Sequence, residues 1–326
     1  MAVAPLPTVR ACELQAQPPE ARWLIRQVWV AEGVGVVGGQ PKLGKSWAGL
    51  DMAISVASGT PCLGRFLVER PGPAVVYLAE DGLGAVRSRI DAICTHRRLD
   101  LHRLPLHVIT APVLRLDLAE HQAALHATME HLRPRLLVLD PLVRLHRLDE
   151  NAASDMSGLL GFLRELQREW AVAIALVHHA SKRSRARPGQ ALRGSSDLHA
   201  FVDSLAYLAR RDDELLLHLE HRSAPAPEPV PLRLVHGPGG RSTHLQVIGD
   251  DEQQELPVPL EARVMQILDT ADQPLMRKEL RERLRVNNHR LGQALERLEQ
   301  QGETQRTDQG WLRRMTPQEA THAAAR

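Results

Sequence analysis

The residues whose chemistry is clearest lie in the stretch GVGVVGGQPKLGKS, which begins at Gly33 and ends at Ser46. Gly39, Gly44, Lys45 and Ser46 complete the pattern Gly-x-x-x-x-Gly-Lys-Ser. The pattern is specific here because an apolar run precedes it and a helical pattern follows it. Backbone N–H groups of such a loop surround phosphates, and the positive end of the next helix faces them. We therefore expect a nucleoside triphosphate site; the alternative is a glycine-rich strand-to-helix turn that binds nothing.

Each position of this loop has an expected role. Lys45 would reach the β- and γ-phosphates, and the Ser46 hydroxyl would hold Mg²⁺. The residues expected to bind the nucleotide are Gly39, Gln40, Pro41, Lys42, Leu43, Gly44, Lys45, Ser46 and Trp47.

Carboxylates follow two apolar runs downstream of the loop. Glu80 and Asp81 end one run, at the strand edge where ligands bind in open α/β sheets. One carboxylate near the γ-phosphate suffices to orient water, so Glu80 is the expected catalytic residue. The run LLVLD ends in Asp140 and has the form of a Walker B segment, so Asp140 would ligate Mg²⁺ through water beside Ser46. The alternatives are a solvated acidic turn and an ordinary strand end.

Two histidines, His178 and His179, end a further apolar run. A polar side chain at this point can contact the γ-phosphate and report its loss. Successive strand residues face opposite sides of a sheet, and we favour His179 as the sensor. The alternative is a histidine with a purely structural role.

A polar, basic loop runs from Lys182 to Arg193 and is longer than most connections. Such a loop can contact the backbone of single-stranded nucleic acid; the alternative is a solvated loop without a ligand. The expected contacts are Lys182, Arg183, Arg185 and Arg187. Arg193, in a Gly-Ser turn, and Arg222, after a later apolar run, are two candidates for an arginine that acts on a neighbouring subunit's nucleotide. The sequence does not separate their roles.

The elements that must position these residues alternate between short apolar runs and amphipathic segments. Strands are expected at 33–37, 74–79, 106–109, 136–140, 172–177, 204–209 and 215–219. Helices are expected at 46–58, 83–97, 119–132 and 152–170. This alternation indicates an α/β fold, with a mainly parallel sheet covered on both faces. The later strands lack long helices between them, which predicts an antiparallel extension at one edge.

The C-terminal part is expected to form a separate small unit. Helices are expected at 260–268, from Pro274 onward and at 287–301, followed by a hairpin within 303–314. Three helices and a hairpin are typical of a winged-helix domain. Side chains near the start of the third helix that could contact DNA are Arg277, Lys278, Arg285, Asn287, Asn288, His289 and Arg290. Positive and negative charges nearly balance in this part, so a protein-interaction module is the alternative.

The predicted organisation has five parts. They are a flexible N-terminal arm at 1–21, the P-loop ATPase domain at 22–248, a linker at 249–259, the winged-helix-like domain at 260–315 and a disordered tail at 316–326.

Composition limits the classes of protein that fit. The chain has 326 residues, 43% of them hydrophobic and only 3% aromatic, so a substantial aliphatic core is expected. The net charge of +2 means that nucleic-acid contacts must come from local patches. Cys12, Cys62 and Cys94 have no metal-binding spacing and are expected to be ordinary thiols. No signal peptide and no membrane-spanning run is apparent, so a cytoplasmic protein is expected.

Five segments together resemble the RecA-like hexameric ATPases, most closely the RepA-type plasmid helicases and related phage and mobile-element ATPases. They are GGQPKLGKS, VVYLAEDG, LLVLDPLVRLH, LVHHASK and LRGSS, in that order. The resemblance implies a RecA-like core, ATP with Mg²⁺, a homo-oligomeric ring, typically a hexamer, and single-stranded DNA as a partner. It implies that Glu80 is the catalytic carboxylate, Asp140 the Walker B acid and His179 the γ-phosphate sensor. It further implies that Arg193 acts in trans and that Arg89 packs on the adenine base.

The expected function is therefore an ATP-driven, ring-forming DNA motor, either a helicase or a single-stranded DNA translocase of a plasmid, phage or other mobile element. The alternative is an ATP-switched DNA-binding regulator or loader that uses the C-terminal winged helix.

Overall fold

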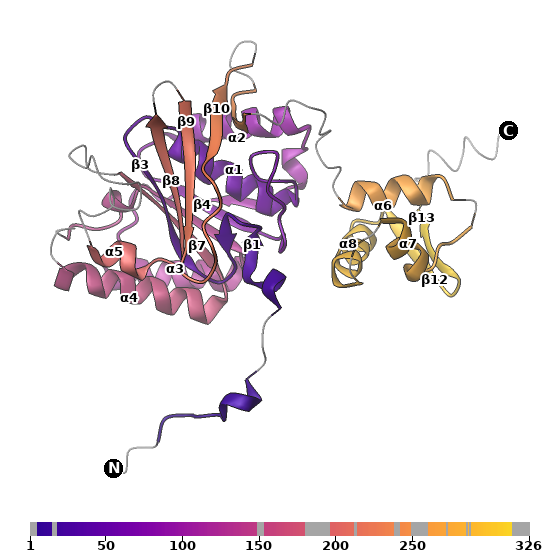
Figure 1. Ribbon diagram of the computed structural model, residues 1–326, viewed down its shortest axis with the longest axis horizontal. Helices are drawn as coiled ribbons and strands as arrows, with labels where there is room; N and C mark the ends of the chain where they lie inside the picture. The colour runs from indigo at the N-terminus through magenta and orange to yellow at the C-terminus, as the bar shows by residue number, and fades with distance from the viewer. Residues whose placement is uncertain are drawn as a thin grey trace. The chain divides into compact units, whose positions relative to one another are not determined.

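The computed structural model describes residues 5–14, 18–148, 153–179, 196–211, 214–237, 242–248, 260–271, 273–284, 286 and 288–314. Contacts divide the chain into two units, Met1–Gln254 and Glu255–Arg326. Figure 1 labels helices and strands of both units. None of the helices in the described part of the chain combines the length and the apolar character needed to cross a membrane.

The first unit is built on a nine-stranded sheet with the strand order β11-β10-β9-β8-β3-β7-β6-β4-β5. The strands are β3 Val34–Gly39, β4 Ala74–Leu78, β5 Leu106–Val108, β6 Leu136–Asp140, β7 Ala173–His179, β8 Ser204–Arg211, β9 Glu214–His221, β10 Val230–Val235 and β11 His244–Val247. Pairing is parallel from β5 to β8 and antiparallel from β8 to β11. One strand, β7, separates the phosphate-loop strand β3 from β6, which is a RecA-like arrangement. The predicted fold class and the antiparallel extension are confirmed.

Helices cover both faces of the sheet, and this explains why the central strands are continuous apolar runs. They are α1 Lys45–Ser58, α2 Leu83–Arg97, α3 Ala119–Leu132 and α4 Ala153–Trp170. Val76 and Val138 belong to the core formed with α1 and α2. Their neighbours Val75 and Leu137 belong to the core formed with α3 and α4. Each strand therefore holds two helical layers in place, and its carboxyl end lies at the edge that carries the phosphate loop.

Several short elements complete the first unit. Strands β1 Trp23–Ile25 and β2 Trp29–Val30 pair with each other, and helix α5 spans Ser196–Phe201. In the expected N-terminal arm, two 3-10 turns form at Ala11–Glu13 and Pro19–Arg22. The flexibility of this arm stays a prediction.

The second unit consists of three helices and a hairpin, as expected. These are α6 Leu260–Asp269, α7 Arg277–Leu284, α8 Asn288–Gln300, β12 Thr304–Thr307 and β13 Gly310–Arg313. Its small core includes Val264, Leu280, Leu291, Leu295 and Trp311. The expected linker at 249–259 and the expected tail at 316–326 lie outside the described residues.

Candidate nucleotide-binding site

The phosphate-binding motif lies where β3 ends and α1 begins. Gly39 and Gly44 have φ values of 147° and 86°, in the region that favours glycine. A Cβ atom on Gly39 would lie 2.4 Å from the carbonyl oxygen of Leu208 in the adjacent strand β8. The motif therefore needs glycine to let the chain turn tightly into α1, whose N-terminal N–H groups point toward the loop.

Lys45, the first residue of α1, is buried, with 4% of its surface exposed. Its Nζ donates a hydrogen bond of 2.7 Å to the carbonyl oxygen of Gln40 inside the loop. Burial lowers the pKa of Lys45 to about 8, and the carboxylate of Asp140 opposes this shift. The loop thus holds a poorly solvated cation, which favours a bound anion.

Ser46 and Asp140 come together although 94 residues separate them in the sequence. The two side chains are hydrogen-bonded, and Asp140 is 6% exposed. Burial raises the pKa of Asp140 to about 6, and the negative charges of Asp81 and Glu80 add to the rise, while the hydrogen bond from Ser46 and the charge of Lys45 oppose it. A carboxylate that is hard to ionise without a cation is suited to a site that a metal completes.

These residues fit a bound Mg²⁺. The ion prefers oxygen ligands and takes only one or two of them from the protein beside phosphate and water. The Ser46 hydroxyl would supply one protein oxygen, and the Asp140 carboxylate would hold the ion through a water molecule. When bound, the ion would neutralise charge on the β- and γ-phosphates.

Glu80 follows β4, which pairs in parallel with β6, and the N–H of Ala79 donates to the carbonyl oxygen of Asp140 at 2.7 Å. This pairing brings Glu80 to the same edge as Asp140. One oxygen of Glu80 accepts a hydrogen bond of 2.7 Å from Nε of Arg144, and both side chains are about half exposed. Sequence reasoning missed Arg144, which lies just beyond the Walker B strand in the short 3-10 helix Leu142–Arg144.

The two histidines lie at the end of β7, between the loop strand and the Walker B strand. In the parallel register His179 is opposite Gly39 and His178 is opposite Gly38. His178 is half-buried and His179 is exposed. The pairing puts His179 beside the first glycine of the loop, and its role as a sensor stays a prediction.

Arg89 contacts two neighbouring residues, Asp81 and Trp47. Its guanidinium forms two hydrogen bonds with the carboxylate of Asp81, of 2.5 Å and 3.0 Å. It also lies 5.8 Å from the centre of the Trp47 ring. Arg89 and Trp47, both expected to contact the nucleotide, are therefore in contact with each other.

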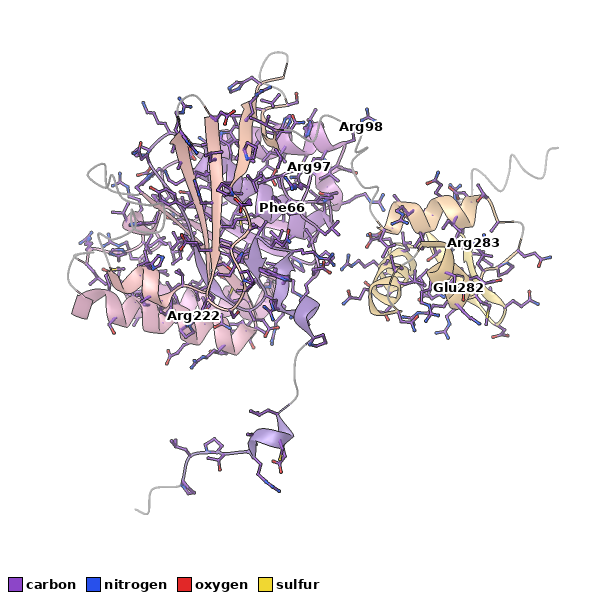
Figure 2. All side chains as sticks on the ribbon, in the orientation of Figure 1. Phe66, Arg97, Arg98, Arg222, Glu282 and Arg283 are labelled. Atoms are coloured by element: carbon purple, nitrogen blue, oxygen red, sulfur yellow. The ribbon has the colours of Figure 1, made fainter. Side chains whose placement is uncertain are left out.

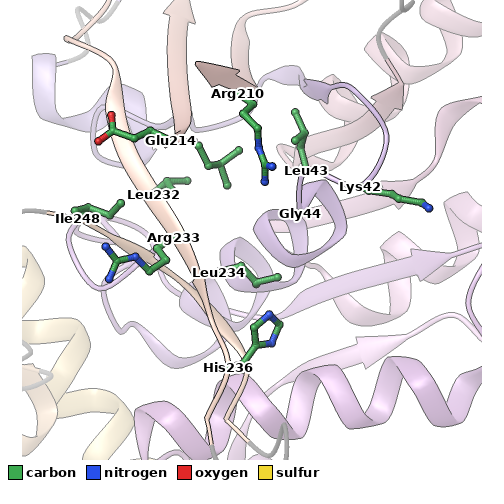
Figure 3. Close-up of a pocket in the computed structure, with 11 residues that line it drawn as sticks. Lys42, Leu43, Gly44, Arg210, Glu214, Leu232, Arg233, Leu234, His236 and Ile248 are labelled. Atoms are coloured by element: carbon green, nitrogen blue, oxygen red, sulfur yellow. The ribbon is translucent and has the colours of Figure 1, made fainter. Parts of the chain in front are cut away.

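A pocket of about 440 Å³ opens beside the loop (Figure 3). The loop residues that line it are Lys42, Leu43 and Gly44. The other polar residues that line it are Arg210, Glu214, Arg233 and His236. Leu215, Leu232 and Leu234 are among the residues that add apolar surface. Sequence reasoning missed these residues, because their strands β8, β9 and β10 meet the loop only through tertiary pairing.

Arg222 lies at the opposite edge of the sheet from the loop. It follows β9, whose His221 pairs with Ser204 at the start of β8. Figure 2 labels Arg222. Its guanidinium contacts the carbonyl oxygens of Ala200 and Phe201 and lies 3.5 Å from Asp203. Asp203 is hydrogen-bonded through its N–H to Val34, so about five residues of β3, or roughly 17 Å, separate Arg222 from Gly39.

The structure does not describe several of the predicted site residues. Lys182, Arg183, Arg185, Arg187, Arg193, Arg285 and Asn287 lie outside the described residues, as do the side chains of His289 and Arg290. In the second unit, Arg277 donates a hydrogen bond of 2.5 Å to the carbonyl oxygen of Asn288 and contacts Gly292. Arg277 therefore joins α7 to α8, whereas Lys278 is exposed.

Comparisons with known proteins found one matching family profile and several similar solved structures. A family profile described as an AAA domain matches residues 3–185, which is more than half of the chain. One similar solved structure is described as an ATPase domain, at 13% identity and a TM-score of 0.49, over 65% of this chain and 84% of that one. Another is a DnaB-like replicative helicase described with its interactions with primase, at 13% identity and a TM-score of 0.49, over 63% of this chain and 57% of that one.

The match to the AAA domain covers the phosphate loop, Glu80 and Asp140, whose geometry is that of a P-loop site. The chain therefore belongs to the AAA domain family and is a P-loop ATPase.

Proposed function

We propose that this protein is an ATP-hydrolysing, ring-forming DNA motor, a RepA-like helicase or single-stranded DNA translocase of a plasmid, phage or other mobile element. The observation that carries the proposal is the hydrogen bond between the side chains of Ser46 and Asp140, next to the buried Lys45. The motif resemblance, which includes the segments VVYLAEDG and LRGSS, supports a motor rather than another P-loop enzyme.

In the proposed reaction Lys45 binds the β- and γ-phosphates, and Ser46 and Asp140 hold Mg²⁺. Glu80 orients the attacking water, because its carboxylate stands at the same strand edge as Asp140. His179, opposite Gly39, contacts the γ-phosphate and responds to its loss.

The nucleoside lies in the pocket beside the loop. Its volume of about 440 Å³ and its lining of leucine side chains suit a nucleobase and a ribose. Arg210, Arg233 and His236 supply planar cationic or aromatic groups that can stack on a base. Arg89, by contrast, is already bound to Asp81, and it reaches the base only by leaving that carboxylate.

Ring formation is supported by the position of Arg222. It lies about five strand residues, or roughly 17 Å, from the loop of its own chain, which is farther than an arginine side chain reaches. Any action of Arg222 on a nucleotide therefore requires a second copy of the chain. Head-to-tail contacts of this kind form a ring when the rotation between copies closes, and an open filament when it does not.

The test is steady-state ATP hydrolysis with and without single-stranded DNA at low salt. The proposal predicts that DNA raises the rate and that Lys45→Ala abolishes hydrolysis in both conditions. Particle mass is then measured with a non-hydrolysable ATP analogue and single-stranded DNA. A ring of several subunits supports the proposal; a monomer or dimer, or a rate that DNA leaves unchanged, contradicts it.

A second candidate function is an ATP-switched regulator or loader that binds duplex DNA through the second unit. It is favoured by α7, where the exposed basic residues Arg277, Lys278 and Arg283 outnumber the exposed acidic residues Glu279 and Glu282. Figure 2 labels Arg283 and Glu282 on this helix. The exposed residues of the C-terminal half of α8 include Glu296 and Glu299, which repel phosphate. Contact through α7 is therefore more favourable than contact through the C-terminal half of α8.

The regulator is tested by duplex-DNA binding in the full chain. Lys278→Glu with Arg283→Glu is predicted to weaken binding at least tenfold, because two phosphate contacts are lost. The matched control is Glu299→Gln on α8, which is predicted to leave binding unchanged or slightly tighter. Tight duplex binding with slow hydrolysis and no unwinding would favour the regulator over the motor.

A further inference from the structure

The residue proposed to orient water, Glu80, is held in an ion pair. Its carboxylate accepts a hydrogen bond of 2.7 Å from Nε of Arg144, and no other described residue forms an ion pair with it. Arg144 lies four residues beyond Asp140, so the pair joins the ends of the two strands that carry the acidic residues of the site.

The backbone around Arg144 is fixed while its side chain extends into solvent. The N–H of Arg144 donates to the carbonyl oxygen of Pro141 at 3.1 Å, and the N–H of Leu145 donates to that of Leu142 at 2.9 Å. The carbonyl oxygen of Leu145 in turn accepts from Leu116 at 2.6 Å. The Arg144 side chain is 63% exposed, and its described contact is with Glu80. The fold therefore fixes the backbone of Arg144 within reach of the Glu80 carboxylate, while the exposed guanidinium can enter and leave the pair.

A guanidinium bound to a carboxylate changes what the carboxylate can do. The charge-assisted hydrogen bond holds the carboxylate in one orientation. The hydrogen bond also occupies an oxygen that would otherwise face the attacking water. Because both partners are about half exposed, the pair is weak and is present for only part of the time.

We propose that Arg144 is a positioning residue that keeps Glu80 paired and thereby lowers the turnover of the DNA-free enzyme. The inference rests on the proposed role of Glu80 in ATP hydrolysis. It adds a restraint on that residue, supplied by the same chain.

The test compares steady-state ATP hydrolysis without DNA in the full-length wild type, Arg144→Ala and Arg144→Lys. Removal of the guanidinium is expected to raise kcat about two- to fivefold, which is the range that a solvent-exposed pair can account for, and to leave KM unchanged. Arg144→Lys keeps the charge and is expected to match the wild type. The control is Arg147→Ala, because Arg147 is also exposed and its guanidinium makes no ion pair with a described residue.

Three results would overturn the proposal: a kcat that is unchanged or lower in Arg144→Ala, a change in KM instead of kcat, or a lysine variant that behaves like the alanine variant. Arg144→Ala must also have no effect on residual hydrolysis in a Glu80→Gln background. Acceleration there would mean that Arg144 does not act through Glu80.

A failure of the proposed function differs from a failure of the Arg144 proposal, because in the first case the wild type would show no ATP hydrolysis that depends on Lys45. The ion pair between Arg144 and Glu80 can also be tested by NMR, without measuring ATP hydrolysis. The Nε–H resonance of Arg144 is expected to shift in Glu80→Gln, and an unchanged resonance would overturn the proposal.

Discussion

The ion pair between Asp51 and Arg97 is predicted to be essential for the stability of the nucleotide-free protein. Asp51 lies on α1, behind the phosphate loop, and Arg97 ends α2; their side chains are 1% and 5% exposed. Arg97 also donates to the hydroxyls of Ser55 at 2.7 Å and Thr60 at 3.2 Å. The pair therefore fastens the two helices that cover one face of the sheet.

The magnitude follows from burial. Removing one partner leaves a buried charge without compensation, which costs about 3–5 kcal/mol. Arg97→Met leaves Asp51 with the N–H of Leu63, at 2.7 Å, and the weakly donating thiol of Cys62 as described hydrogen-bond donors, and neither carries a positive charge. A domain of this size is typically stable by about 5–15 kcal/mol, so either single variant is expected to lose a large share of the total. The double variant Asp51→Leu with Arg97→Met removes both charges and is expected to recover most of the loss.

The assay is urea unfolding of the full chain, followed by tryptophan fluorescence. Four of the five tryptophans lie in the first unit, so the signal reports mainly on that unit. Arg98→Met is the matched control, because Arg98 is the adjacent residue and is exposed (Figure 2). Single variants that cost less than about 1 kcal/mol, or a double variant that costs as much as the sum of the two, would refute the reasoning.

Three further predictions concern the phosphate loop and the Walker B acid. The pH profile of kcat/KM is expected to fall below about 6, as Asp140 is protonated and loses the metal, and above about 8, as Lys45 loses its charge; a flat profile from pH 5 to 9 would contradict this. Asp140→Asn is expected to abolish hydrolysis yet stabilise the nucleotide-free protein at pH 7.5 by about 1–3 kcal/mol. The gain arises because the folded pKa of Asp140, about 6, lies above its ordinary value of 3.8, so the cost to the wild type grows above about pH 4 and is complete above about pH 6. The gain should vanish below about pH 4, where the wild-type side chain is protonated in both states, and thermal unfolding at pH 7.5 and below pH 4 checks the sign. Gly39→Ala forces a Cβ against the Leu208 carbonyl oxygen and is expected to destabilise the protein by at least about 2 kcal/mol in a urea titration; a cost near zero would show that β8 moves aside freely.

The sequence predicted the regular elements well because burial imposes clear periodicity on them. Helices α2 and α3 begin and end at the predicted residues, and β6 has the predicted bounds. Strands β10 and β11 were not predicted: β10 contains Pro231, β11 has only four residues, and both take their place from pairing at one side of the sheet.

The candidate site divides in the same way. Lys45, Ser46 and Asp140 could be proposed from the sequence because Lys45 and Ser46 complete a motif that follows an apolar strand and Asp140 ends another such strand. Arg144, Arg210 and His236 carry no such pattern, and they reach the site only through contacts between distant segments. The sequence also does not reveal the contact between His96 and His244, whose ring centroids lie 3.4 Å apart and which joins α2 to β11.

We propose that an arginine from a neighbouring subunit completes the phosphate-loop site, and Arg222 is the candidate among the described residues. The most direct test mixes two inactive variants, Lys45→Ala and Arg222→Ala, and measures ATP hydrolysis in the presence of single-stranded DNA. In a randomly mixed ring with equal amounts of each, about a quarter of the interfaces join an intact loop to an intact arginine. Activity is expected to return to roughly that fraction of the wild-type rate, whereas a mixture no more active than the mean of the two separate variants would contradict the proposal.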